Sequence, residues 1–346
     1  MPSAQTSSAV CPVFGSCGGC QYQHLDYADE LVLKEAALKE VLRGALPLDE
    51  GLFYPIAASP KIYHYRNRLD LKLIHRRNGD IHIGFSPADR GPVIEIDACP
   101  IAMEVISEFI PRLRQEASAA IPKEYRMANL TVRCGEGDGI RWGGIGRKSL
   151  RLEARDYFYV DILGRRIYYS LVSFFQANLS ILPLLIDFLR GQEIWSRDAV
   201  FFDLYGGVGF FGMCVNDLVT RVVNIEENVH AVRLAKYNVS ANSLGNVDAM
   251  EGRVEDVLPR LLAEAMTEEN IVMVDPPRAG LSQDAVALLN GLKRARYLVY
   301  LSCDPGNLAA NLKALVAGGW SVMRVRPFDF FPRTRHLETL VILKRP

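Results

Sequence analysis

Hydrophobic and polar positions follow different patterns in the two halves of this 346-residue chain. In the first half, apolar and polar residues alternate within short runs such as 69–74 and 80–85, and turn residues separate these runs. This pattern is typical of strands with one buried face. One segment, about 28–42, instead places Leu31, Leu38 and Leu42 on one face of a helix. The first half is therefore predicted to be β-rich, with few helices.

From about residue 170 the pattern changes to apolar runs that are each followed by a turn and a helical stretch. These runs cover 199–204, 221–226, 270–275 and 296–301. Strands that alternate with helices predict a mostly parallel sheet covered on both faces. Two final runs, 320–326 and 339–343, have no helix between them and predict a closing strand pair. We expect two domains, 1–168 and 169–346.

The charge balance changes this picture only locally. Forty basic and forty acidic residues give no net charge, which argues against a general polyanion binder but allows basic patches. Three segments are locally positive: 61–77, 141–166 and 324–335. The first interleaves Tyr63 and Tyr65 with its basic residues, a combination that suits single-stranded nucleic acid. A solvated charged face is the alternative for each segment.

The cysteines point to a metal or cluster rather than to disulfides. The N-terminus lacks the features of a signal peptide, and no apolar run reaches the roughly 18 residues that span a bilayer, so we expect a cytoplasmic protein without membrane contact. Disulfides are rare in that compartment. Cys11, Cys17 and Cys20 lie within ten residues, and Cys99 precedes a proline. This spacing leaves zinc and an iron–sulfur cluster open. Cys134 and Cys214 are predicted to be packing residues.

A glycine-rich turn, 203–209, follows the predicted strand 199–204 and opens a helix. Its spacing matches neither the dinucleotide fingerprint nor a phosphate loop. Asp203 ends one strand and Glu226 ends the next, so Glu226 is placed to hold ribose hydroxyls, while Tyr205 and Gly206 lie in a turn where the backbone can approach a ligand. The arrangement resembles the S-adenosylmethionine site of class I methyltransferases.

Cys303 ends the apolar run 297–302 in the sequence Ser-Cys-Asp-Pro. In an open α/β sheet, ligands bind outside the carboxyl ends of the strands. A thiolate at that position can attack a substrate, whereas the alternative is a cysteine that only packs.

Five segments together resemble one family, the RNA uracil-C5 methyltransferases. They are Phe-Phe-Gln-Ala-Asn at 174–178, the turn 203–209, Asp-Pro-Pro-Arg-Ala-Gly at 275–280, Ser-Cys-Asp-Pro at 302–305, and Phe-Pro-Arg-Thr-Arg-His-Leu-Glu at 331–338. The resemblance implies an α/β fold: a class I S-adenosylmethionine-dependent methyltransferase domain, Rossmann-like, preceded by a β-rich iron–sulfur and RNA-binding domain. It also implies roles for individual residues. Gln176, Asp203 and Glu226 would contact S-adenosylmethionine, Asp275 would lie between cofactor and base, Cys303 would be the nucleophile and Glu338 the general base.

The cysteine set adds to this resemblance. Cys11, Cys17, Cys20 and Cys99 are similar to the four-cysteine [4Fe–4S] site of many family members, which favours the branch that makes 5-methyluridine in 23S ribosomal RNA. A transfer-RNA enzyme and a catalytically silent iron–sulfur RNA-binding protein are the alternatives. We expect a monomer. The chain starts ten residues before Cys11, so we expect RNA affinity to come from basic stretches within 61–166 rather than from the N-terminal barrel of many relatives.

The chemistry explains why a thiol and a carboxylate are both needed. A thiolate adds to C6 of uracil, C5 takes the methyl group, and a carboxylate then removes the C5 proton so that the thiol can leave. Glu338 is 35 residues beyond Cys303, and the two can meet only if the terminal strand folds back beside the strand that ends at Cys303. Two positions depart from the family pattern: Gly206 replaces a usual cysteine, and Asp304 replaces a usual asparagine. Asp304 is expected to raise the pKa of Cys303 by like-charge repulsion.

Overall fold

The computed structural model describes residues 9–76, 80–87, 91–122, 124–137, 139–144, 157–264 and 270–345. Arg77 and residues 145–156, which belong to the predicted basic segments, lie outside the described residues. Within the described ranges, no helix has the length and apolar character needed to cross a membrane.

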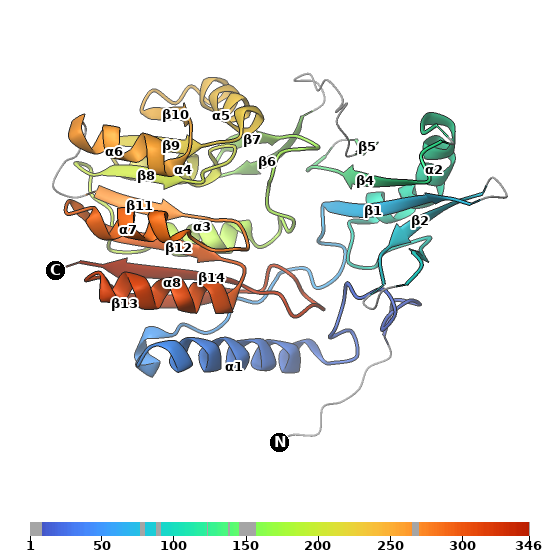
Figure 1. Ribbon diagram of the computed structural model, residues 1–346, viewed down its shortest axis with the longest axis horizontal. Coiled ribbons are helices and arrows are strands. Elements are labelled where there is room, and N and C mark those ends of the chain that lie inside the picture. Colours follow the sequence, from blue (N-terminus) through green and yellow to red (C-terminus); the bar gives the residue numbers. More distant parts are fainter. Residues whose placement is uncertain are drawn as a thin grey trace.

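The first half contains a five-stranded antiparallel sheet, at the right of Figure 1. Its order is β3-β2-β1-β4-β5, with bounds Ile94–Glu95, Ile81–Phe85, Arg68–His75, Met127–Arg133 and Arg141–Gly144. Alternate residues of β1, Leu69, Leu71 and Leu73, are buried and pack with helix α2 (Glu104–Ala120). The predicted alternation at 69–74 and 80–85 is confirmed, because one face of this sheet meets α2.

The second half is built on a seven-stranded sheet in the order β10-β9-β8-β11-β12-β14-β13. The parallel strands are β8 (Val200–Leu204), β9 (Arg221–Glu226), β10 (Val247–Glu251), β11 (Asn270–Val274) and β12 (Ala295–Ser302). β14 (Glu338–Lys344) runs antiparallel between β12 and β13 (Ser321–Phe328). The strands are connected by the helices α4 (Phe210–Val215), α5 (Val229–Ala241), α6 (Val254–Glu264), α7 (Gln283–Gly291) and α8 (Pro305–Ala317), and α3 (Leu182–Arg190) precedes β8. The predicted parallel sheet and its closing strand pair are confirmed.

The second sheet is buried on both faces. Along β8, Phe201 belongs to one apolar cluster, whereas Phe202 belongs to the cluster on the opposite side, and neither has exposed surface. This is why the parallel strands read as continuous apolar runs rather than as alternating ones.

Two segments from before residue 168 pack against this second half. Helix α1 (Tyr27–Ala45) lies beside α8 (Figure 1), and its Leu38 and Leu42 join the cluster of Phe202. The hairpin β6 (Phe158–Ile162) and β7 (Arg165–Tyr169) contributes to the cluster of Phe201. The expected boundary at 168 therefore falls inside β7, and the two-domain division stays a prediction.

The helix predicted at 28–42 is confirmed, but its buried face is not wholly apolar. Leu31 is half-buried, whereas Glu30 and Lys34 are buried. Burial of charged groups is tolerated here because the two side chains pair with each other at 2.7 Å.

Candidate active site

The glycine-rich turn after β8 is fixed by its own backbone and by β9. Tyr205, Gly207 and Gly209 have φ angles of 58°, 54° and 85°, a left-handed region that favours glycine. A Cβ at Gly206 would lie 1.9 Å from Nδ2 of Asn224, so only glycine fits. The amide of Gly207 donates to Oε2 of Glu226 at 3.0 Å. The glycine in place of the usual family cysteine thus has a packing reason in this chain.

Asp203 lies beneath this turn rather than on its open side. Its side chain is fully buried, and Oδ2 accepts hydrogen bonds from the amide of Gly212 at 2.9 Å and from Nδ2 of Asn224 at 3.4 Å. Burial raises the pKa of Asp203 to about 7. Asp203 therefore ties the start of α4 to β9. Asn224 was missed by the sequence analysis, although a polar residue inside the apolar run 221–226 was a signal.

A cavity of about 190 Å³ lies at the carboxyl ends of the parallel strands. Tyr205 and Glu226 line it, together with Gly252, Pro277 and Gly280. This is the position where ligands bind in open α/β sheets. Two of the residues predicted to bind the cofactor, Tyr205 and Glu226, are thus brought together on one cavity.

Gln176 and Asp275 approach each other from different elements. Nε2 of Gln176 lies 3.5 Å from Oδ2 of Asp275, which follows β11. Burial, reinforced by the charge of Asp203, raises the pKa of Asp275 to about 7. The chain around Gln176 is held from the first sheet, because Nδ2 of Asn67 donates to the carbonyl of Gln176 at 3.1 Å.

A buried arginine of β4, Arg133, completes this support. Its Nη1 donates to the carbonyls of Ser170 and Ser173 at 2.7 and 2.6 Å, and its Nη2 donates to that of Phe175 at 3.1 Å. The guanidinium also lies over the ring of Tyr169, 4.7 Å from its centroid. Neither Arg133 nor Asn67 stood out in the sequence, since nothing in the local pattern shows which carbonyls they reach.

Cys303 and Glu338 occupy neighbouring positions on paired strands. β12 and β14 run antiparallel, with Ser302 opposite Thr339, so Cys303 follows one strand where Glu338 begins the other. Cys303 is half-buried, and Glu338 is 6% exposed. The terminal strand therefore folds back as the sequence required for the two residues to meet.

The surroundings of Cys303 keep its thiol protonated at rest. Burial raises its pKa to about 11, and the charges of Glu338 and Asp275 act in the same direction, while Arg278 opposes them. Burial, with Asp275, also raises the pKa of Glu338 well above its ordinary value. Any attack by Sγ of Cys303 would first need the thiol proton to be removed.

The groups that most affect the pKa of Cys303 do not include the expected residue, Asp304. Its Oδ1 accepts a hydrogen bond from the amide of Asn307 at 2.8 Å, so the carboxylate caps the N-terminus of α8. The like charges that raise the pKa of Cys303 come from Glu338 and Asp275 instead.

One cavity of about 240 Å³ is lined by Cys11, Cys17, Cys20 and Cys99, together with Phe14. Burial raises the pKa of Cys20 to about 11, and the nearby thiols add to this effect. Burial also raises the pKa of Cys99, and the neighbouring amides of Ala102 and Ile101 oppose this rise. Among the described residues, no three His, Cys, Asp or Glu side chains are arranged as a metal-holding group. Cys134 and Cys214 are buried packing residues, as predicted.

Comparison with known proteins places the chain in a family. The sequence model of the tRNA (uracil-5-)-methyltransferases matches residues 147–346. The chain belongs to this family. It is an S-adenosylmethionine-dependent RNA (uracil-5-)-methyltransferase.

The relatives of this methyltransferase match most of its length. An uncharacterized RNA methyltransferase of Clostridium tetani is 28% identical over 388 residues, covering 97% of this chain and 84% of the relative. One from Aquifex aeolicus is 29% identical over 370 residues, with the same shares. The tRNA (uracil-54, C5)-methyltransferase of Pyrococcus abyssi, solved in complex with S-adenosyl-L-homocysteine, superposes with a TM-score of 0.74 at 23% identity, covering 94% of this chain and 85% of that one. The class I methyltransferase fold is thereby confirmed.

In this methyltransferase, one tyrosine of the basic segment 61–77 differs from expectation. Tyr65 is 2% exposed, and its hydroxyl donates to the carbonyl of Pro332 at 3.0 Å, so its ring does not face RNA. Tyr63 is half-buried. Arg68 pairs with Asp70 at 2.8 Å.

Proposed function

We propose that this methyltransferase converts a uridine of 23S ribosomal RNA to 5-methyluridine through a covalent bond between Sγ of Cys303 and C6 of the uracil. One observation carries the mechanism: the thiol of Cys303 directly follows β12 at the end where the carboxylic acid of Glu338 begins the paired strand β14. One is a nucleophile, and the other is a base, which are the two groups that the reaction needs.

Each residue serves a separate step. The Cys303 thiolate adds to C6, and the C5–C6 π electrons move to give an enolate with electron density at C5. S-adenosylmethionine supplies the methyl group that C5 then takes. The Glu338 carboxylate removes the C5 proton, the C5–C6 double bond forms again, and the thiolate leaves. Burial raises the pKa of Glu338, so its carboxylate, once ionised, is a stronger base for this step.

The proposed cofactor residues divide by position. Tyr205, Gly206 and Glu226 would contact the nucleoside at the cavity beyond β8 and β9. Gln176 and Asp275, which contact each other, would lie between that cavity and Cys303. Asp203 would act through the turn that it supports.

We also propose that Cys11, Cys17, Cys20 and Cys99 hold one [4Fe–4S] cluster. The fit rests on four thiols that line one cavity. Such a cluster would brace the N-terminal segment and would take no part in methyl transfer, which needs no electron.

The cluster is tested by measuring iron and acid-labile sulfide on protein purified without oxygen. Four irons and four sulfides per chain are expected for such a cluster. One zinc without sulfide would contradict this proposal.

Ribosomal RNA is proposed as substrate because the cysteine set is similar to that of the ribosomal branch. Transfer RNA is the second candidate, since the matched family and the Pyrococcus abyssi enzyme are both named for it. Mass mapping of 5-methyluridine in both RNAs, from cells with and without the gene, separates the two. Loss of the modified nucleotide from transfer RNA alone would favour the second candidate.

We propose that the enzyme acts as a monomer, and light scattering tests this.

The mechanism is tested by the variant Glu338→Gln. It should still add to C6 and methylate C5 but fail to remove the proton, so protein linked to RNA should persist on a denaturing gel. Glu251→Gln, an exposed change at the end of β10, is the matched control and should turn over normally. Wild-type turnover of Glu338→Gln without a trapped species would show that another group is the base.

A further inference from the structure

The loop 329–337 joins β13 to β14 and leads directly into Glu338, so we name it the general-base loop. Three of its polar side chains are buried: Asp329, Arg333 and Thr334 are 0%, 6% and 2% exposed. Arg333 has a φ angle of 69°, which non-glycine residues adopt when their surroundings impose it. The position of this loop therefore depends on the residues that pack around it.

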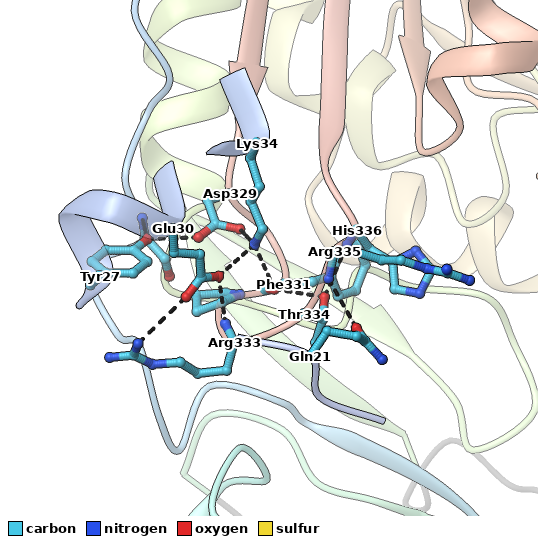
Figure 2. Close-up of polar contacts among 12 residues, drawn as sticks. Gln21, Tyr27, Glu30, Lys34, Asp329, Phe331, Arg333, Thr334, Arg335 and His336 are labelled. Atoms are coloured by element: carbon cyan, nitrogen blue, oxygen red, sulfur yellow. Dashed lines mark hydrogen bonds and ion pairs between the residues drawn. The ribbon is translucent and has the colours of Figure 1, made fainter. Parts of the chain in front are cut away.

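Lys34 of α1 is one of these residues (Figure 2). Its ammonium donates to Oε1 of Glu30 and Oδ1 of Asp329, both at 2.7 Å, and to the carbonyl of Phe331 at 3.1 Å. An ammonium has three hydrogens, so all of its donors are used. On the other side of Asp329, Tyr27 donates its hydroxyl to Oδ2 at 2.8 Å.

Arg333 completes the buried network. Its amide donates to Oε1 of Glu30 at 2.7 Å, and its Nη1 donates to the carbonyl of Leu25 at 2.7 Å. Two cations thus face two carboxylates, since Lys34 and Arg333 lie against Glu30 and Asp329. Buried ion pairs contribute little net stability, but a buried charge that loses its partner is costly. The network therefore favours the one position of the general-base loop in which every charge is paired.

The second connection comes from the cysteines. We define the cysteine loop as residues 11–20. Directly after it, the amides of Gln21 and Tyr22 donate to the carbonyl of Arg333 at 2.9 and 3.0 Å. Oε1 of Gln21 accepts from the amide of Arg335 at 3.1 Å, as Figure 2 shows, while its Nε2 donates to the carbonyl of Gly18 at 2.7 Å. The Gln21 side chain therefore bridges the cysteine loop and the general-base loop.

We propose that Gln21 is a positioning residue for Glu338: its side chain fixes the general-base loop to the cysteine loop, against the buried Lys34 network. This inference rests on the proposed function, in which Glu338 removes the C5 proton. The general-base loop leaves β13 at Phe328 and returns to the chain at Glu338, its register partner, whereas Cys303 lies between β12 and α8 and is not joined to this loop. Loss of the Gln21 side chain should therefore slow proton removal and leave thiol addition and methyl transfer unchanged.

The test is single turnover of Gln21→Ala with substrate RNA and S-adenosylmethionine. Methyl transfer should proceed at the wild-type rate, while release of the methylated RNA slows about tenfold, a barrier change of about 1.4 kcal/mol. Protein linked to RNA should accumulate on a denaturing gel. Gln21→Glu keeps an acceptor for the amide of Arg335 but loses the donor to the carbonyl of Gly18, so release should stay slow, because the bridge needs both ends. Should the alanine variant fail to fold, Gln21→Asn is measured instead, since its shorter side chain withdraws from both loops.

The control is Gln192→Ala, which removes another glutamine that donates to a backbone carbonyl, that of Phe188 at 2.7 Å, at the end of α3. It should release RNA normally. Wild-type release by Gln21→Ala, equal slowing of methyl transfer and release, or the same defect in Gln192→Ala would overturn the positioning role. Glu338→Gln is run in parallel. If it traps no RNA, the assigned base is wrong; if it traps RNA and Gln21→Ala does not, only the role of Gln21 fails.

Discussion

The catalytic cysteine proposed for this enzyme and its four-cysteine set are held in different ways. Cys303 follows β12, a strand hydrogen-bonded on one side to β11 and on the other to β14. Cys11, Cys17 and Cys20 lie on a loop, where turns such as Cys17 N to Val13 O, at 3.1 Å, set the backbone. Cys99 belongs to a separate loop. A sheet can fix a nucleophile before substrate arrives, whereas ligands on two loops take their final geometry from the group that they bind.

The largest effect should come from removing the nucleophile. Cys303→Ala should reduce methylation by more than about a thousandfold, because the thiol proposed to add to C6 is gone. Methyl incorporation into RNA and the denaturing gel are both measured, and no linked species should form. Cys214→Ala, a buried thiol of α4, is the control and should keep its activity. Retained activity in Cys303→Ala would rule out the covalent mechanism.

The reactivity of Cys303 should depend steeply on pH. With a pKa raised to about 11, the thiolate fraction grows about tenfold per pH unit between pH 7 and 9. Alkylation by iodoacetamide, followed by mass spectrometry of the Cys303 peptide, should therefore accelerate roughly a hundredfold over that range. Glu338→Gln removes a like charge, which lowers the pKa of the thiol and should speed alkylation where Glu338 is ionised. A rate that levels off near pH 7 would show that the thiol is activated at rest.

A smaller effect is expected when a single residue of the cofactor site is replaced. Glu226→Ala removes the carboxylate that lines the cavity, and hydrogen bonds to a charged group contribute about 1.5–3 kcal/mol, so the affinity for S-adenosylmethionine should fall roughly ten- to hundredfold. Calorimetry measures it. Glu251→Ala changes the residue that pairs with Glu226 in register but is exposed, and it should bind normally. Unchanged affinity in Glu226→Ala would place the ribose contact elsewhere.

The sequence could predict what depends on local pattern. Apolar runs identified the strands, and β14 lies beside β12 as the chemistry of Cys303 and Glu338 required. It could not predict contacts between distant segments. Lys34 pairs with Asp329, which is 295 residues away in the sequence. Its charged side chain lies on the face of α1 that the leucines predicted to be apolar. Such pairs leave no periodic signal, because each partner alone looks like an ordinary surface residue.

Asp304 gives the smallest expected effect and the sharpest check on the charges around Cys303. Its carboxylate caps α8 through the amide of Asn307, and asparagine caps helices about as well. Asp304→Asn should therefore leave both the alkylation profile of Cys303 and the thermal midpoint unchanged. Asp304→Ala loses the cap and should cost about 1 kcal/mol of stability, again without moving the profile. If Asp304→Asn instead shifted alkylation toward lower pH as far as Glu338→Gln does, the charge of Asp304 would act on the thiol directly, and helix capping would not account for its effect.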